Sequence, residues 1–365
     1  MAKEPPPRSA RKPARGESEA SLKNQLERLD RELLKLFNSR AKLMGQLSRV
    51  HSGNSPAAER DTDVLAQNKG PLTNDCVRSV FRELDSGARA LEKPLRVAVL
   101  GPAYSYSHLA ALERFGSSVE HVPVASISAV FEEVNRGHAN YGVVPVENST
   151  DGRIADTLDM FTRLRVRICG EVQLRIHHHL LGKCPRSEVT EVYSRPQALS
   201  QCRNWLIRHL PAARPIEVTS TSTAAQLAQN KQGAAAIASV QAGVHYGLEV
   251  LAENIEDNQA NVTRFAIIGD ESATRTGHDK TAAMFEVEHR PGSLADAMAI
   301  FKRNRLNLTW IESFPIPRQE GGYLFFIELD GHENEVRVRR ALESLGKRAL
   351  RLEVLGSYPR SQPVG

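Results

Sequence analysis

The sequence predicts a multidomain protein with an all-α unit, a two-lobed α/β unit and a smaller α+β unit, in that order. Three observations predict this architecture. Leucines recur at helical spacing near the amino terminus, strand-like and helix-like runs alternate in the middle, and a βαββαβ order of elements closes the chain. A length of 365 residues is sufficient for two or three domains.

Residues 18–93 are predicted to be entirely helical. Apolar residues recur there at steps of three and four, at Leu22, Leu26, Leu29, Leu33, Leu36, Leu43, Leu47 and Val50. This spacing predicts one amphipathic helix of roughly 30 residues, which is longer than a usual globular helix and favours a bundle or an intertwined dimer. Residues 52–57 end this helix, a second helix is predicted near residues 60–68, and a third runs to about Leu91.

Residues 95–273 are predicted to form an α/β unit with parallel strands and crossover helices. The strand-like runs are residues 95–101, 141–148, 188–194, 213–220, 233–239 and 263–270. Helix-like runs lie between them, for example residues 127–134, which Gly137 follows, and residues 224–229. Because about 180 residues are many for one sheet, we expect two lobes with a cleft between them.

Residues 279–360 are predicted to form the third unit. Its strands are expected at residues 281–289, 306–316, 323–331 and 350–358, and its helices at residues 293–303 and 333–345. This βαββαβ order is the ferredoxin-like arrangement. Gly292, after Pro291, marks the turn into the first helix.

The composition is that of a soluble protein, with 41% hydrophobic and 25% charged residues. No run approaches the ~18 apolar residues that span a bilayer, and the amino terminus lacks the apolar segment of a secretory signal, so we expect a cytoplasmic protein without a membrane partner. Residues 1–15 carry five basic side chains and one acidic, which is most of the net charge of +5. We therefore expect a disordered basic tail over residues 1–17 and no nucleic-acid partner. The four cysteines lack CxxC spacing and are expected to be reduced.

A strand of buried character over residues 142–146 runs directly into four hydrogen-bonding side chains, Glu147, Asn148, Ser149 and Thr150. The alternatives are a turn, a glycosylated Asn148 and a ligand site at the carboxyl end of a strand, and the missing secretory signal removes glycosylation. Similar polar clusters adjoin other predicted strands, at residues 101–108, 193–197, 219–223 and 261–265. Each cluster alone is more often a helix cap or a turn, whereas five at the edges of one α/β unit favour a binding site.

Arg40 occupies a position in the apolar stripe of the first helix, between Leu36 and Leu43. A buried, unpaired guanidinium is costly, so Arg40 either extends to solvent, forms a structural salt bridge or binds a small anion. His51 lies about three helical turns further on, on the same side. These residues are candidates for an anion pocket in the helical unit.

Seven stretches of the chain together resemble one enzyme family. They are GPAYSYSHLAA, VPVENSTDGRIADTLD, YSRPQ, YGLEVL and NVTRF in the α/β unit, and RPGSLADAM and IESFPI in the third unit. With these stretches the chain resembles the bifunctional chorismate mutase–prephenate dehydratases of phenylalanine biosynthesis over about residues 20–360, nearly its whole length. The resemblance implies a helical mutase-type domain, a dehydratase domain like the periplasmic binding proteins and a regulatory ACT domain.

The resemblance implies that the α/β unit removes carbon dioxide and water from prephenate and leaves phenylpyruvate. A hydroxyl leaves poorly unless a donor protonates it or hydrogen-bonds to it, and a carboxylate leaves more easily where water is scarce. By the family pattern Thr263 is the essential residue, and Arg264 either holds a carboxylate or is structural. The other expected catalytic residues are Asn148, Ser194 and Gln201, and the expected prephenate-binding residues are Ser105, Glu147, Ser149, Thr150, Thr223 and Arg264.

For the helical unit the resemblance implies the rearrangement of chorismate to prephenate. The expected chorismate-binding residues are Lys23, Arg40, His51, Arg60, Asp61 and Glu92. Lys23 stands where the family has an arginine, and His51 stands where a lysine normally donates to the migrating ether oxygen. Glu92 takes the position that faces this oxygen.

For the third unit the resemblance implies feedback control by phenylalanine. The expected effector-binding residues are Gly292, Ser293, Leu294, Glu312, Ser313 and Phe314. Phe314 replaces an arginine of the family pattern. Tyr104, in the α/β unit, replaces a glycine and is expected to narrow the cleft.

No metal or organic cofactor is expected, because one reaction is a rearrangement and the other an elimination without redox change. GxGxxG, P-loop and HExxH motifs are missing, and His177, His178 and His179 would alternate between the two faces of a strand. We expect a homodimer or a higher homo-oligomer. Two alternatives remain open, a dehydratase whose helical part only dimerises and a two-lobed ligand sensor without catalysis.

Overall fold

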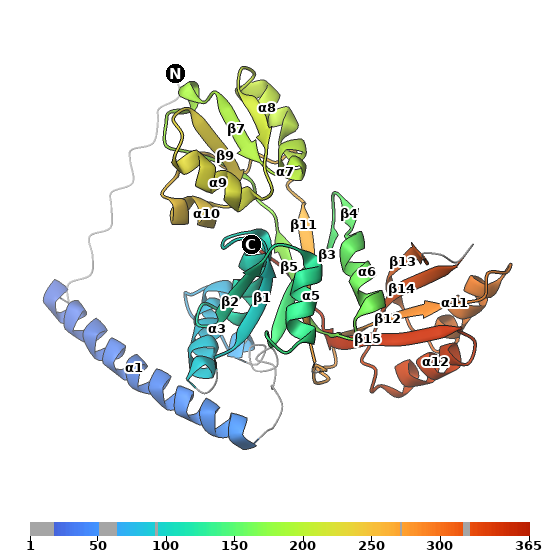
Figure 1. Ribbon diagram of the computed structural model, residues 1–365. Helices are drawn as coiled ribbons and strands as arrows, with labels where there is room; N and C mark the ends of the chain where they lie inside the picture. The colour runs from blue at the N-terminus through green and yellow to red at the C-terminus, as the bar shows by residue number, and fades with distance from the viewer. Residues whose placement is uncertain (1–17, 51–63, 92–93, 271, 317–321) are drawn as a thin grey trace, which may run out of the picture.

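The computed structural model describes residues 18–50, 64–91, 94–270, 272–316 and 322–365 (Figure 1). The helical unit consists of α1 (Glu19–Val50) and α3 (Asn74–Ala90), which contact each other. These bounds confirm the long first helix and the third predicted helix. Of the second predicted helix, residues 60–63 lie outside the described residues, as does the predicted amino-terminal tail, and residues 64–66 are helical.

Helix α3 fastens the helical unit to the α/β unit. Arg82 pairs with Glu113 at 2.5 Å, and Glu83 accepts hydrogen bonds from the backbone N–H and the hydroxyl of Ser117 at 3.0 and 2.6 Å. Helix α1 instead extends along the outside of the molecule, with α3 between it and the first lobe (Figure 1).

The first lobe of the α/β unit is built on a sheet with the strand order β16-β5-β11-β3-β1-β2, in which β4 pairs with β3. Its strands are β1 (Arg96–Leu100), β2 (Glu120–Val124), β3 (Tyr141–Asn148), β4 (Gly152–Arg153), β5 (Arg167–Arg175), β11 (Val262–Gly269) and β16 (Pro363–Val364). Helix α4 (Tyr106–Phe115) packs on one face of this sheet, and α5 (Ile127–Asn135) and α6 (Ala155–Arg163) pack on the other.

The prediction of parallel strands is wrong for part of this sheet. Strand β1 is parallel to both β2 and β3, but β11 is antiparallel to both of its neighbours, β3 and β5. The reason is that β11 returns from the second lobe and therefore enters the sheet from the opposite end. The sheet is mixed.

The second lobe has the strand order β10-β6-β9-β7-β8. Its strands are β6 (His179–Gly182), β7 (Glu191–Ser194), β8 (Arg214–Glu217), β9 (Ala234–Ala238) and β10 (Glu249–Ala252). Its helices are α7 (Pro196–Gln201), α8 (Arg203–His209), α9 (Thr221–Gln229) and α10 (Val240–Tyr246), with a 3-10 turn at Arg186–Glu188. Two segments, residues 176–178 and 253–261, join the lobes (Figure 1), so the two-lobed prediction is confirmed.

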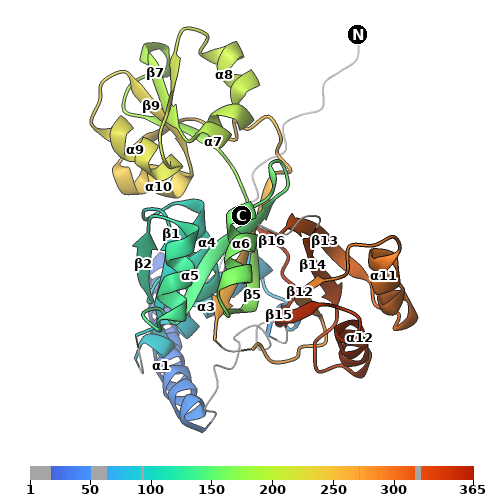
Figure 2. The same ribbon diagram turned by 45° about the vertical axis from the view of Figure 1, so that its right-hand side comes forward.

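The third unit is a sheet of order β13-β14-β12-β15 with two helices on one face, as the βαββαβ pattern predicted. Its elements are β12 (Asp279–Glu286), α11 (Ser293–Arg303), β13 (Leu308–Pro315), β14 (Tyr323–Asp330), α12 (Val336–Gly346) and β15 (Arg351–Pro359). The other face of this sheet lies against the first lobe (Figure 2). There Met284 and Phe326 share a core with Leu158 and Phe161.

The chain ends by returning to the first lobe. Strand β16, which follows β15, pairs with β5 in parallel. At Gly356 of β15, where φ is 151°, a Cβ atom would clash with the carbonyl oxygen of Ile168 in β5, so a glycine is required for this close approach. The third unit and the first lobe are therefore joined through strands as well as side chains.

Two expectations from composition can be compared with this structure. Cys76, Cys169, Cys184 and Cys202 form no disulfide with one another in this structure. No helix in the described ranges combines the length and apolarity that crossing a bilayer needs.

Candidate active site

A cleft of about 880 Å³ separates the two lobes. Helices α4, α5 and α9 begin at this cleft, and each has a serine cap that lines it, at Ser105, Ser126 and Ser220. The caps accept hydrogen bonds from backbone N–H groups of the first helical turns at 3.4, 3.1 and 3.0 Å. Because helix amino termini carry partial positive charge and free N–H groups, their convergence makes the cleft suitable for an anion without many charged side chains.

Asn148 and Thr263 lie opposite each other in neighbouring strands on the wall of this cleft. The backbone N–H groups of Thr150 and Asp151 donate to Asn148 Oδ1 at 2.9 and 3.0 Å. This orients the amide nitrogen, which donates to Thr263 Oγ1 and Asn261 Oδ1, both at 2.8 Å. Thr263 Oγ1 is thus an acceptor toward Asn148, and no acceptor for its own hydrogen occurs among the described residues. That hydrogen is available to a ligand in the cleft.

The hydrogen-bond network continues from Asn261 into the second lobe. Asn261 donates to Gln201 Oε1 at 3.1 Å, His178 Nε2 lies 2.9 Å from the same oxygen, and Gln201 donates to Asp151 at 3.2 Å. Burial lowers the pKa of His178, so His178 is neutral near pH 7 and donates through Nε2. Neutral amides and a neutral imidazole therefore position Thr263 from both lobes.

Arg195 is the cation of the cleft, and the residue that sequence reasoning missed. It precedes Pro196 at the start of α7, and no other arginine or lysine among the described residues lines the cleft. Its Nε donates to Gln197 at 2.9 Å. Burial lowers its pKa, against the opposing effect of the Asp151 carboxylate, but an arginine remains charged. The signal was present in the YSRPQ stretch, where an arginine follows directly on a strand.

Several predicted site residues do not line the cleft. Ser194 is fully buried and donates to the carbonyl of Ile237 at 2.7 Å, and Thr223 hydrogen-bonds with Ser220 at 2.8 Å within the first turn of α9. Ser149 and Thr150 are exposed in the turn after β3. These four residues lie at strand ends or at a helix start: Ser194 ends β7, Ser149 and Thr150 follow β3, and Thr223 is in the first turn of α9. Of the residues predicted for the dehydratase, the structure brings Asn148, Thr263, Gln201 and Ser105 together at the cleft.

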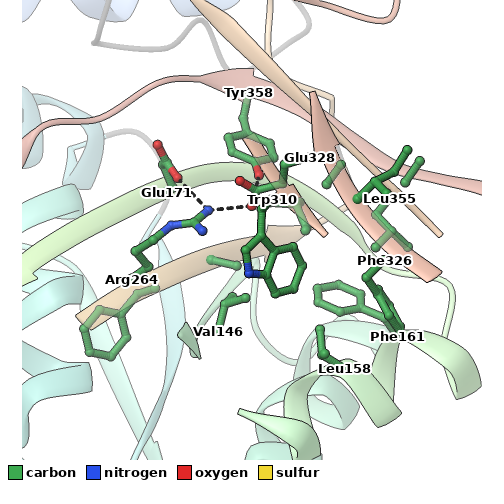
Figure 3. Close-up of a pocket in the computed structure, with 16 residues that line it drawn as sticks. Val146, Leu158, Phe161, Glu171, Arg264, Trp310, Phe326, Glu328, Leu355 and Tyr358 are labelled. Carbon is green, nitrogen blue, oxygen red and sulfur yellow. Dashed lines mark hydrogen bonds and ion pairs between the residues drawn. The ribbon is translucent and has the colours of Figure 1, made fainter. Parts of the chain in front are cut away.

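Arg264 lines a cavity between the first lobe and the third unit (Figure 3). Neither Arg264 nor its partner Glu147, both predicted to bind prephenate, lines the interlobe cleft. Side chains alternate along β11, so Arg264 points away from the side where Thr263 lies. Its guanidinium pairs with Glu147 at 2.8 Å, Glu171 at 3.3 Å and Glu328 at 2.5 Å. Burial alone would lower the pKa of Arg264, but Glu328 and Glu171 raise it. The structural alternative for Arg264 is the one that the geometry supports.

Tyr104 joins the two lobes at one side of the cleft. It has a left-handed backbone with φ of 63°, a conformation that a glycine adopts without strain. Its ring stacks on His245 of the second lobe with 4.3 Å between centroids, and the Ser222 hydroxyl donates to the neighbouring carbonyl of Ala103 at 2.5 Å. Tyr104 thus packs between the lobes and is not part of the cleft lining.

The described residues of the helical unit do not form a complete anion site in one chain. Lys23 pairs with Glu19 at 2.7 Å, and Arg40 pairs with the buried carboxylate of Asp85 at 2.6 Å and lies over the ring of Phe81. His51, Arg60, Asp61 and Glu92 lie outside the described residues. Within a single chain Arg40 therefore forms a structural salt bridge, which was one of the three alternatives for this residue.

The predicted effector residues lie at two places in the third unit. Gly292, with φ of 89°, precedes Ser293 and Leu294 at the start of α11. On β13, Glu312 and the carbonyl of Ser313 accept hydrogen bonds from Arg153 of the first lobe, at 2.7 and 3.0 Å. Phe314 packs against the core shared with the first lobe, 6.3 Å from the ring of Phe326.

Comparisons with known proteins determine the family. A prephenate dehydratase family model matches residues 97–273, and an ACT domain model matches residues 281–347. A bifunctional chorismate mutase/prephenate dehydratase from Stutzerimonas stutzeri is 42% identical over 355 aligned residues, which cover 93% of this chain and 97% of the relative. The chain belongs to the bifunctional chorismate mutase/prephenate dehydratase family.

Two solved structures share the fold of the dehydratase and ACT parts. A prephenate dehydratase from Arthrobacter aurescens in complex with L-Phe is 32% identical, with a TM-score of 0.69, over 74% of this chain and 92% of that chain. A quorum quenching acylase is 27% identical, with a TM-score of 0.67, over 73% of this chain and 98% of that chain. Since one fold occurs under two named activities, the assignment of this chain's activity rests on its site residues.

Proposed function

We propose that residues 95–273 bind prephenate in the interlobe cleft and convert it to phenylpyruvate, carbon dioxide and water. The observation that carries this proposal is the Asn148–Thr263 pair, in which the threonine hydroxyl accepts from Asn148 and its hydrogen is left available to a cleft at which several helix amino termini lie. A dianionic substrate suits such a cleft.

In the proposed mechanism Thr263 donates to the departing C4 hydroxyl. The electron pair of the bond to the ring carboxylate moves into the ring, which becomes aromatic, and the carboxylate leaves as carbon dioxide. The hydroxyl leaves as water with the proton that Thr263 supplies, and Thr263 Oγ1 regains a proton from solvent. We assign the carboxylate that is retained to Arg195 and the α9 amino terminus, which line the cleft. The ring carboxylate leaves as carbon dioxide more readily on the side of the cleft that offers it no cation.

We propose that residues 18–93 rearrange chorismate to prephenate in a homodimer. Lys23 and Arg40 are 17 residues apart on α1, which is about 25 Å along the helix axis, so one small molecule cannot contact both in the same chain. A second chain that lies antiparallel along α1 would bring its Lys23 to the first chain's Arg40. The leucines that remain exposed on α1 support such a partner.

We further propose that residues 279–360 bind phenylalanine and lower dehydratase turnover, in a cytoplasmic enzyme. Support comes from the contact of Arg153 with Glu312 and Ser313, which connects the predicted effector segment to the strand that pairs with Glu147 and Asn148. The position of Phe314 in the core assigns it a packing role in place of the effector contact of an arginine.

The test is to supply the purified full chain with prephenate and, separately, with chorismate, and to follow prephenate and phenylpyruvate. We expect both substrates to end as phenylpyruvate, with prephenate appearing transiently from chorismate. Phenylpyruvate from prephenate alone would leave only the dimerisation role for the helical unit, and no product from either would favour a ligand sensor. Calorimetry with millimolar phenylalanine tests the effector, and an absence of binding heat contradicts it.

A further inference from the structure

Arg264 and Glu328 connect the active-site strand to the ACT domain (Figure 3). Glu328 lies on β14, and its carboxylate is 2.5 Å from the Arg264 guanidinium, with side chains only 5% and 16% exposed. Thr263 is the residue before Arg264 and faces the opposite side, where it lines the cleft. A contact with the ACT domain is therefore made one residue from the proposed proton donor.

The pair belongs to a buried network that neither domain completes alone. Lys280 of the ACT domain lies 3.1 Å from Glu171 of the first lobe and 3.5 Å from Glu328. The Tyr358 hydroxyl donates to Glu328 at 3.0 Å. If β14 moved away from β11, buried charges on both sides would lose their partners, which is strongly unfavourable. The ion pair therefore holds the cleft end of β11 in position against β14.

The predicted effector segment is close to this network in the ACT sheet. Strand β13 pairs with β14, and Trp310 is the register partner of Glu328. Two residues further along β13, Glu312 accepts from Arg153, which is itself the register partner of Glu147 beside Asn148. Thr263 is next to Arg264, which pairs with Glu328 of the ACT domain. Asn148 is next to Glu147, whose register partner Arg153 donates to Glu312 of the ACT domain.

We propose that Arg264 is a positioning residue for Thr263, and that Glu328 sets its position from the ACT domain, so that an effector on β13 changes turnover through this ion pair. The proposal rests on the proposed dehydratase function. It assigns Arg264 no contact with substrate.

The physical reason is the sensitivity of the Asn148–Thr263 contact to strand position. The hydroxyl hydrogen is available to the cleft because Asn148 donates to Thr263 at 2.8 Å, across the register between β3 and β11. A shift of the cleft end of β11 changes this distance and the direction of the hydroxyl. Misplacement of a reacting group by about 1 Å can lower turnover by ~100-fold. A partial loss of the network is expected to cost about tenfold.

The experiment compares two carboxylate-to-amide variants of the full chain. Glu328→Gln is expected to lower kcat for prephenate about tenfold, to leave KM within about twofold, and to weaken inhibition by phenylalanine while calorimetric phenylalanine affinity is unchanged. The matched control is Glu333→Gln. Glu333 pairs with Arg167 at 2.7 Å between the same two domains, but Arg167 is the register partner of Gly269, at the end of β11 far from Thr263. This control is expected to keep wild-type kcat and inhibition.

Tyr358→Phe is a second variant that tests the proposal if Glu328→Gln does not fold. It removes one hydroxyl from the network and keeps every charge, and it is expected to lower kcat by a smaller factor with an unchanged melting temperature. Wild-type kcat and wild-type inhibition in Glu328→Gln would overturn the proposal. An equal loss of kcat in Glu333→Gln would also overturn it, because any weakened contact between the two domains would then have the same effect. An active wild type that phenylalanine does not inhibit would overturn the effector part. A wild type that leaves prephenate unchanged would instead overturn the proposed function itself.

Discussion

The helical unit and the α/β body differ in how completely one chain buries its apolar residues. On α1, Leu26 is 60% and Leu36 is 64% exposed, although both belong to the regular apolar stripe. In the first lobe, Val97 and Val143 are fully buried. Exposed leucines in a regular row indicate a surface that needs a partner chain, whereas the core of the first lobe is buried within one chain. The difference teaches that the two proposed sites depend differently on assembly.

The residues of the two proposed sites differ in the same way. In the α/β unit, residues of one chain meet at the cleft although they are far apart in the sequence, as are Asn148 and Thr263 of the first lobe, which are 115 residues apart. In the helical unit, Lys23 and Arg40 lie far apart on one straight helix. The dehydratase is therefore expected to work within one chain, and the mutase between two.

The largest expected effect tests the body alone. Thr263→Ala removes the donor to the departing hydroxyl and is expected to lower prephenate turnover by ~100–1,000-fold. Circular dichroism is expected to be unchanged, because the side chain is small and its one hydrogen-bond partner among the described residues, the Asn148 amide, can bond to water. Thr263→Ser keeps the hydroxyl and is expected to retain most of the rate. Near-normal turnover in the alanine variant would contradict the assignment of Thr263.

The next effect tests the dependence of the helical unit on a partner. Leu33→Glu places a charge in the apolar stripe of α1 and is expected to weaken association of the chains about 100-fold or more. Chorismate turnover is expected to fall with it at low protein concentration, while prephenate turnover per chain remains. Glu27→Gln, at an exposed position of the same helix, is the control. The measurements are analytical sedimentation and the turnover of chorismate and of prephenate. An unchanged oligomeric state with full chorismate turnover in Leu33→Glu would contradict the dependence of the mutase on a partner chain.

A smaller effect concerns Arg195, the cation of the cleft. Arg195→Gln is expected to raise KM for prephenate by ~10-fold and to change kcat less, because a charge-assisted hydrogen bond to a carboxylate contributes about 1.5–3 kcal/mol. Arg208→Gln, on the exposed helix α8, controls for the loss of one positive charge. Steady-state kinetics of both variants decide the matter. A KM that rises equally in both would remove Arg195 from the site.

The smallest effect concerns His51 in the proposed mutase. A fixed cation at the ether oxygen stabilises the charge that grows there, and a histidine with a reference pKa near ~6.5 is mostly neutral at pH 7.5. Protonation as the pH falls therefore adds the cation. We expect chorismate turnover to be weak at pH 7.5, to rise several-fold toward about pH 5–6, and to rise in His51→Lys at pH 7.5. A fast wild type at pH 7.5 that the lysine variant does not improve would show that another cation reaches the oxygen.

Much of the fold was predictable where apolar residues recur at an uninterrupted helical or strand spacing. The spacing of leucines located α1, and the run YLFFIELDG located β14. Strands β2 and β5 were missed for identifiable reasons. Strand β2 contains Glu120, His121 and Pro123 and lies at the sheet edge, while β5 contains Gly170 and Glu171 in its middle. Glu171 is tolerated there because Arg264 and Lys280 pair with it, and those partners are distant in the sequence.

The candidate site was predictable to the level of motifs. The sequence by itself determined the order of the three units, the polar strand ends and the residue types at the cleft, because periodicity and local hydrogen-bonding chemistry are properties of short segments. Only the tertiary structure decided which residues of a motif face the substrate. Thr263 and Arg264 are neighbours in one motif, but β11 places a cleft on one side and the ACT domain on the other. Because side chains alternate along a strand, these two neighbours point to opposite sides. The cleft on the side of Thr263 is built with segments more than a hundred residues away, and the partner Glu328 on the side of Arg264 belongs to a different domain.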